Sequence, residues 1–230
     1  MKCGINGAEH DFNAIPCGIN GAVRQASELW IGVNGATKKV WPTFPVGTVI
    51  VLDTVGSSSW ECPASGSWGI ELHGGGGGGG EGSYSSTWYG NSGGGGGGSG
   101  EYTTVNLVEG TVYDYTIGKG GNPAKYEHSG EDTTFSTLIS VRGGGAGDDA
   151  FAGVDGYGYG GVGRGNIATD GSAGSEGMYE TPDGGIGGYG NKNKPSQKYG
   201  NGGQGGPGVQ RGTVRGNPGE NGAIILTYLG

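Results

Sequence analysis

Two uninterrupted glycine runs constrain this chain more than any other feature of its sequence. They are Gly74–Gly80, which follows a β-rich segment, and Gly93–Gly98, which precedes another. Glycine has no side chain to bury and loses the most conformational entropy on folding. With 61 glycines among 230 residues and 32% hydrophobic residues, an ordinary hydrophobic core cannot run through the whole chain. Any order in these runs has to come from backbone contacts.

Collagen, a flexible linker and an ordered glycine array are three ways to interpret such a composition. Collagen is excluded because no Gly-X-Y period is sustained and nine prolines are too few. A Gly/Ser-rich linker predicts rapid proteolysis between Gly143 and Gly222. Five Trp, twelve Tyr and several β-branched segments favour a folded protein instead. In such a folded protein, we expect the glycine segments to form left-handed threefold helices that bond to one another through their backbones. The loops between these helices are then displayed at the two ends of a stiff block.

A 14-residue repeat occupies the beginning of the chain. CGINGA starts at Cys3 and again at Cys17, and IGVNGA starts at Ile31. Asn-Gly is the preferred dipeptide of two-residue hairpin turns, so the sequence predicts three β-hairpins within residues 1–44. Because a lone hairpin has no core of its own, we expect this segment to pack against its own repeats or against other subunits. Its expected role is assembly or attachment.

The sequence of residues 45–230 predicts a second domain, an antiparallel jelly-roll-like β-sandwich with polyglycine-helix insertions. No helix longer than about two turns is expected because glycine recurs too often, so the predicted class is all-β. A C-terminal strand that follows so much glycine has to dock on the sandwich. The predicted strands are rich in β-branched and aromatic residues: Gly47–Thr54, Ser67–His73, Glu101–Glu109, Thr111–Gly118, Thr133–Val141 and Gly222–Leu229.

Charge, hydropathy and cysteine content narrow the class of protein further. A net charge of −8 argues against a nucleic-acid partner, which needs a clustered basic surface. No segment approaches the roughly 18 apolar residues of a membrane span, and the N-terminus lacks the apolar run of a signal peptide. The three cysteines, Cys3, Cys17 and Cys62, are too few and too sparse for a disulfide framework. We therefore expect no membrane insertion and no conventional secretion.

Catalytic and metal-binding motifs are not apparent in the sequence. It contains no Walker, HExxH or GxSxG motif, and His10, His73 and His128 are scattered. Residues Gly144–Phe151 fit one copy of a calcium-binding nonapeptide, but such a site needs stacked repeats. A glycan-cleaving protein would need paired carboxylates in a groove, and this alternative stays open. The expectation is a protein that is not an enzyme and has no metal and no cofactor.

The order of strands and glycine segments after residue 45 resembles a known arrangement. SWGIELHG leads into Gly74–Gly80; GGGGGGSGEY, EGTVYDYTIGKGG and TTFSTLISVRGGG follow, and GAIILTYL closes the chain. This order resembles the glycine-rich domain of bacteriophage and prophage tail-fibre and receptor-binding proteins. It is similar to the glycine-rich region of anaplastic lymphoma kinase and to the distal adhesins of T-even-type phages. The resemblance implies a virion protein at a tail fibre or tail tip that contacts other tail proteins and binds a host-cell surface glycan or protein. It suggests a homotrimer, with a monomeric tip on another fibre as the alternative.

Loops between the glycine segments are the expected contact surface, because exposed Tyr and Trp give large rigid contacts at low entropy cost. Such side chains stack on sugar rings or anchor a protein receptor; alternatively, they cap the edges of the glycine array. The alternative function is a structural head or tail decoration protein that binds no receptor. The loops are Glu81–Ser92, Asn122–Gly130, Asp148–Tyr159, which includes Phe151, Asn166–Asp183 and Tyr189–Tyr199. The predicted receptor-binding residues are Tyr84, Trp88, Tyr89, Tyr126, Tyr157, Tyr159, Tyr179, Tyr189 and Tyr199.

Overall fold

The computed structural model divides the chain into two compact units, Met1–Pro45 and Val46–Gly230. It describes residues 44–81, 95–123, 129–147, 188, 198–204 and 214–230, and only the backbone of the strands that lie outside these ranges. All regular elements in this described part are β-strands, with no helix among them. The predicted all-β class is confirmed.

The first unit contains three antiparallel hairpins that follow the 14-residue repeat. Their innermost paired residues are Ile5 with Ala8, Ile19 with Ala22 and Val33 with Ala36, so one Asn-Gly dipeptide separates the two strands of each hairpin. The dipeptides themselves lie outside the described residues. The predicted hairpins are therefore present, as β1 (Lys2–Ile5) with β2 (Ala8–Asp11), β3 (Pro16–Ile19) with β4 (Ala22–Gln25), and β5 (Leu29–Val33) with β6 (Ala36–Trp41).

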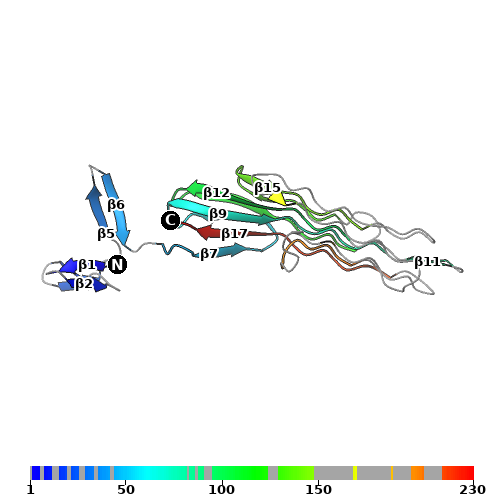
Figure 1. The fold of residues 1–230 in the computed structure, drawn as a ribbon, viewed down its shortest axis with the longest axis horizontal. Helices are drawn as coiled ribbons and strands as arrows, with labels where there is room; N and C mark the ends of the chain where they lie inside the picture. Colours follow the sequence, from blue (N-terminus) through cyan, green and yellow to red (C-terminus); the bar gives the residue numbers. More distant parts are fainter. Residues whose placement is uncertain are drawn as a thin grey trace. The chain divides into compact units, whose positions relative to one another are not determined.

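The second unit contains two antiparallel sheets that pack on each other (Figure 1). The five-stranded sheet has the order β16-β12-β9-β17-β7 and the four-stranded sheet the order β15-β14-β13-β8. The first sheet consists of β7 (Val49–Leu52), β9 (Gly66–His73), β12 (Gly100–Leu107), β16 (Ala168–Thr169) and β17 (Ala223–Tyr228). The second consists of β8 (Gly56–Glu61), β13 (Val112–Ile117), β14 (Thr133–Phe135) and β15 (Ile139–Val141).

The hydrophobic core lies between these sheets. Trp68, on the central strand β9, is fully buried, and its ring lies 5.3 Å from that of Trp60 on the opposite sheet, edge to face. Other fully buried members come from both sheets: Ile70, Leu72, Ile117, Phe135, Ile224 and Leu226. The alternating strand pattern therefore supplies an ordinary core, and this core is confined to the sandwich.

Several strands differ from the predicted ones: one predicted strand is interrupted, and β8, β16 and the short strands β10 (Ser83–Ser85) and β11 (Trp88–Gly90) were not predicted. The predicted strand Thr133–Val141 is interrupted at Ser136, whose φ of 50° lies in the left-handed region. A turn therefore separates β14 from β15, and the Leu138 N–H donates to the Phe135 carbonyl oxygen at 3.2 Å. Strand β8 was not predicted because its sequence, GSSSWE, is poor in strand-forming residues. The docking of the C-terminal strand is confirmed, because β17 pairs with both β9 and β7.

Glycine-rich segments continue the strands beyond the same end of the sandwich (Figure 1). In one of them, Gly74–Gly80, the backbone N–H groups of Gly74 and Gly77 donate to the carbonyl oxygens of Ser99 and Gly96 at 2.9 and 2.8 Å. Groups three residues apart thus reach the same neighbouring segment. A threefold helix produces this period, because every third N–H points in the same direction.

The same period relates this run to a second neighbour. Gly76 and Gly79 donate their N–H groups to the carbonyl oxygens of Glu220 and Asn217 at 2.8 and 2.9 Å. Counting donors and acceptors together, the run bonds to six surrounding segments: 95–99, 118–123, 129–132, 142–147, 198–204 and 215–222. The run is therefore the central member of a hydrogen-bonded glycine array; the sequence analysis expected such an array but not which run lies at its centre.

Close backbone contact explains why the array is built from glycine. A Cβ added to Gly74 or Gly77 would overlap the carbonyl oxygen of Arg142 or Gly145, and one added to Gly75 would overlap that of Lys119. Gly74 and Gly77, three residues apart, thus face the same neighbouring segment, which contains Arg142 and Gly145. Glycine is therefore the packing residue of the array, since any side chain there would push neighbouring backbones apart.

Candidate functional site

The glycine array places several connections at its end away from the sandwich. Segments 74–80 and 95–99 run antiparallel, as do 118–123 with 129–132 and 198–204 with 215–222. A connection between two antiparallel segments starts and finishes at the same end. Residues that join these pairs therefore enter and leave the array at its far end: 81–94, 124–128 and 205–213.

The first connection contains a short hairpin of β10 (Ser83–Ser85) and β11 (Trp88–Gly90). Its register sets Tyr84 directly opposite Tyr89, and Ser85 opposite Trp88. Figure 1 places this hairpin at the far end of the array. The structure thus brings three predicted receptor-binding residues together on one hairpin, as backbone neighbours. The other predicted residues in loops, Tyr126, Tyr157, Tyr159, Tyr179 and Tyr189, together with Phe151, lie outside the described residues.

Tyr199 is the predicted site residue whose side chain the structure describes, and it lies at the sandwich end of the array. Its hydroxyl donates to the Asp53 carboxylate at 3.0 Å, and its half-buried ring lies 6.1 Å from the His73 ring. The Lys198 ammonium lies 5.1 Å from the centre of the tyrosine ring and 3.9 Å from the Asp53 carboxylate. These contacts attach the segment 198–204 to the end of strand β7.

Two of the five predicted loops have described residues at the sandwich end of the array, whereas Asp148–Tyr159 lies outside the described residues. The loop Asn166–Asp183 contains β16, which pairs with Gly100 and Glu101 of β12, and the loop Tyr189–Tyr199 ends beside Asp53. Connection 205–213, at the far end, was not among the predicted loops. It contains no aromatic residue, so a search for aromatic loops misses it; the Val-Gln-Arg interruption of the glycine spacing was the available signal.

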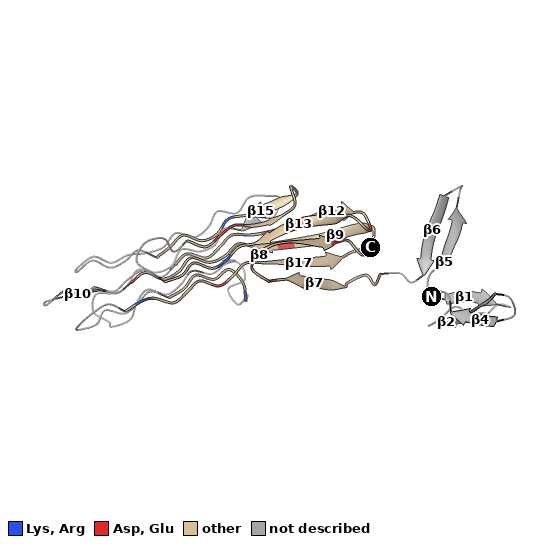
Figure 2. Cartoon of the chain, turned by 180° about the vertical axis from the view of Figure 1, so that it is seen from behind, with Lys and Arg blue, Asp and Glu red and all other residues tan. Residues whose placement is uncertain are grey.

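Polar side chains cap the exposed N–H groups at the rim of the array. Glu131 accepts from the Lys119 N–H at 3.2 Å, Asp132 from the Gly143 N–H at 3.0 Å, and Asn221 from the Gly120 N–H at 3.0 Å. These side chains replace the neighbouring segment that an outer helix lacks. Figure 2 shows charged residues of both signs spaced along this region, with no large patch of one sign among the residues described.

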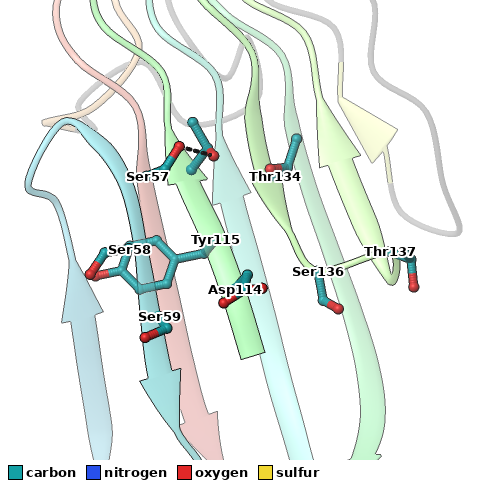
Figure 3. Close-up of a pocket in the computed structure, with 9 residues that line it drawn as sticks. Ser57, Ser58, Ser59, Asp114, Tyr115, Thr134, Ser136 and Thr137 are labelled. Carbon is teal, nitrogen blue, oxygen red and sulfur yellow. Dashed lines mark hydrogen bonds between the residues drawn. The ribbon is translucent and has the colours of Figure 1, made fainter. Parts of the chain in front are cut away.

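A concavity of about 650 Å³ lies on the four-stranded sheet (Figure 3). Hydroxyl groups dominate its lining, and the sequence analysis did not identify it. The hydroxyl groups of Ser57 and Thr116 bond to each other across strands β8 and β13 at 2.9 Å. The other lining residues are Ser58, Ser59, Asp114, Tyr115, Thr134, Ser136 and Thr137.

Two buried residues carry side-chain groups that are often reactive in proteins, a thiol and an imidazole. Cys62 is buried, its thiol donates to the Ala64 carbonyl oxygen at 3.1 Å, and burial raises the pKa of this thiol. His73 is 1% exposed; its Nε2 lies 3.0 Å from the Glu71 carboxylate, and its buried Nδ1 has no hydrogen-bond partner. Within the described ranges, no cluster of three or more His, Cys, Asp or Glu side chains is arranged to hold a metal ion. The same ranges contain no helix long and apolar enough to cross a membrane.

Comparison with known protein families matches residues 53–223 to the family described as glycine-rich domain. The match begins just after strand β7 and ends at the first residue of β17, so it includes the whole glycine array and every strand of the sandwich except β7 and most of β17. No curated protein matches the chain. The protein is therefore a member of the glycine-rich domain family.

Proposed function

We propose that this protein is an adhesin of a bacteriophage tail fibre or tail tip, which binds a host-cell surface glycan or protein through loops held by the glycine array. One observation carries the proposal: antiparallel glycine segments return their connections to the same far end of the array. The hairpin with Trp88 and Tyr89 is in one of these connections. Aromatic residues on a fixed frame are the usual anchors of a binding surface.

The array favours binding because it limits the entropy lost on association. Its backbone hydrogen bonds connect each segment to several others, with donor–acceptor distances such as 2.8 Å for Gly77 to Gly96 and for Gly203 to Gly77. Loops whose ends are fixed in this way have less freedom to lose when they bind a partner. A stiff array is thus suited to display, whereas a flexible linker would offer no fixed surface.

The assignment to a phage tail rests on the order of strands and glycine segments, which resembles that of tail-fibre proteins. Membership in the glycine-rich domain family supports the glycine-rich scaffold of the proposal. Within this proposal the hairpins of residues 1–44 attach the protein to other virion tail proteins, and three copies assemble. A homotrimer multiplies weak contacts by presenting three sets of loops to one cell surface. The rival function, a structural virion decoration, predicts the same scaffold without receptor binding.

The test is adsorption of the labelled full chain to a panel of bacterial strains, with a double variant in which Trp88 and Tyr89 are both replaced by Ala. Loss of central aromatic anchors costs about 2 kcal/mol or more, which is roughly a 30-fold loss of affinity. The variant should keep the wild-type melting curve, because these residues lie outside the sandwich core. Tyr228→Phe, in the sandwich and outside the predicted receptor-binding set, is the matched control and should bind normally.

A second experiment, replacement of the loops, gives the outcome that would reject the adhesin function. If connections 81–94, 124–128 and 205–213 and the predicted loops Asp148–Tyr159, Asn166–Asp183 and Tyr189–Tyr199 are all replaced by Gly/Ser linkers of equal length and adsorption is unchanged, the loops bind no receptor. The structural decoration would then be the better function. The fold of this variant is verified by hydrogen-exchange protection of Gly76 and Gly77, whose N–H groups bond within the array.

A further inference from the structure

We propose that the concavity on the four-stranded sheet is a binding site for a neutral saccharide. This site lies on the sandwich, in contrast to the loops at the far end of the array, and the inference does not depend on a phage setting. It rests on the placement of polar groups on the outer face of strands β8, β13 and β14 (Figure 3).

Strand register gathers the hydroxyl groups on one face. Ser57 pairs with Thr116, which pairs in turn with Thr134, and Ser59 pairs with Asp114. Residues directly opposite each other in a sheet, and residues two apart along a strand, point to the same face. These five side chains therefore share the face that is turned away from the buried Phe135.

The turn between β14 and β15 supplies one wall of the concavity. Ser136 and Thr137, both in this turn, line it. Ser136 has a φ of 50°, which residues other than glycine rarely adopt, and its N–H donates to the Asp114 carbonyl oxygen at 2.7 Å. Such conformations concentrate at binding sites. Here the strained residue is bonded directly to the strand that carries the carboxylate of the concavity.

Most of the lining groups are available to a ligand. Ser57 and Thr116 bond to each other, whereas the side chains of Ser59, Asp114 and Thr134 have no hydrogen-bond or ion-pair partner within the described part of the chain. A hydroxyl group both donates and accepts, and a carboxylate accepts from two donors at once. Sugar hydroxyl groups have the same dual character, so a polyol can satisfy this set in full.

Charge and size select the class of ligand. Asp114 is the one charged residue of the lining, so the site repels phosphate, sulfate and acidic sugars and does not repel a neutral one. The lining offers few apolar side chains, which disfavours an apolar ligand. A volume of about 650 Å³ lies within the range of small-molecule sites.

The test uses the full chain on a glycan array that carries neutral hexose and N-acetylhexosamine oligosaccharides beside sialylated and phosphorylated ones. Wild-type protein should bind neutral glycans only. Ser59→Trp, which fills the concavity, and Asp114→Asn, which keeps the shape but removes the charge, should each lower this binding at least tenfold. Thr104→Trp, on an exposed position of strand β12 in the other sheet, is the matched control and should change binding less than twofold.

Several results would overturn the inference. One is no neutral-glycan binding by the wild-type chain, either on the array or by saturation-transfer NMR with millimolar neutral oligosaccharide. Another is unchanged binding by both Ser59→Trp and Asp114→Asn. A third is loss of glycan binding only when connections 81–94, 124–128 and 205–213 are replaced, which would place the sugar site in the loops and leave the adhesin intact. If Ser59→Trp does not fold, Asp114→Asn decides alone.

Discussion

The Cα atom of Gly77 lies against the carbonyl oxygen of Gly145, so close that a Cβ on Gly77 would overlap that oxygen. Both residues belong to glycine segments that leave the sandwich in the same direction, one after β9 and the other after β15. Backbone atoms alone therefore limit how closely these two glycine segments can approach each other. A hydrophobic core tolerates changes of side-chain volume by repacking, but this contact has no side chain that can move.

Replacing Gly77 with Ala should destabilise the protein by about 3 kcal/mol or more. The new methyl group has to displace a backbone segment, which disrupts the bonds from Gly77 to Gly96 and from Gly203 to Gly77, both 2.8 Å long. Gly110→Ala is the control, since a Cβ there meets nothing within 4 Å and only its positive φ of 76° adds strain. That variant should lose about 1–2 kcal/mol. Urea unfolding measures the loss of unfolding free energy in both variants. Equal losses would contradict the claim that backbone contact at Gly77 leaves no room for a side chain.

Tyr199→Phe should loosen one segment of the array. The change removes the 3.0 Å hydrogen bond to Asp53, which we expect to cost about 0.5–1 kcal/mol because the pair is partly exposed. Hydrogen exchange should become faster at Gly200 and Gly203. Tyr228→Phe removes a comparable 3.1 Å bond to the Ser65 carbonyl oxygen within the sandwich. If exchange at Gly200 increases equally in both variants, Tyr199 has no special role in anchoring the segment.

The strands that the sequence predicted are those whose side chains build the core. Strand β9, with Trp68, alternates apolar and other residues, and the C-terminal strand β17 begins with the continuous apolar run Ala223–Leu226; the two strands are neighbours inside the five-stranded sheet. Strand β8 escaped prediction because three consecutive serines precede Trp60, the one β8 residue whose ring packs in the core, beside Trp68 and Phe135. A strand with a single core side chain leaves little hydrophobic pattern in the sequence.

The glycine array was predicted as an architecture but not in its arrangement. Period-three bonding follows from the backbone of glycine, yet a run such as Gly74–Gly80 carries no side chains that specify its six neighbours. Those neighbours are set by the order of the strands that the segments continue. For the same reason the place of Tyr199 beside Asp53 could not be predicted, because it depends on which segment lies next to β7. The hydroxyl-lined concavity is likewise a product of register between separate strands.

Cys62 should resist thiol reagents in the folded protein and react on unfolding. It is 1% exposed, and burial raises the pKa of its thiol, so little reactive thiolate is present at neutral pH. The measurement is labelling by N-ethylmaleimide in a chain with Cys3→Ser and Cys17→Ser, with and without urea. Labelling should follow the unfolding curve. A fast reaction under native conditions would show that the turn before β9 opens locally.

Glu101→Gln should stabilise the protein at pH 7 and have little effect near pH 4. Glu101 is 8% exposed on strand β12, and burial raises the pKa of its carboxyl group above the ordinary value of 4.5. At pH 7 the folded state therefore holds a poorly solvated carboxylate, which is better solvated in the unfolded chain. As the pH falls through the raised pKa, the folded state takes up a proton first, so this destabilisation disappears towards pH 4.5. Melting temperatures between pH 7 and 4 measure the difference, with Glu61→Gln on the exposed side of β8 as the control. A Glu101→Gln chain less stable than wild type at pH 7 would show instead that the carboxylate is stabilised by its surroundings.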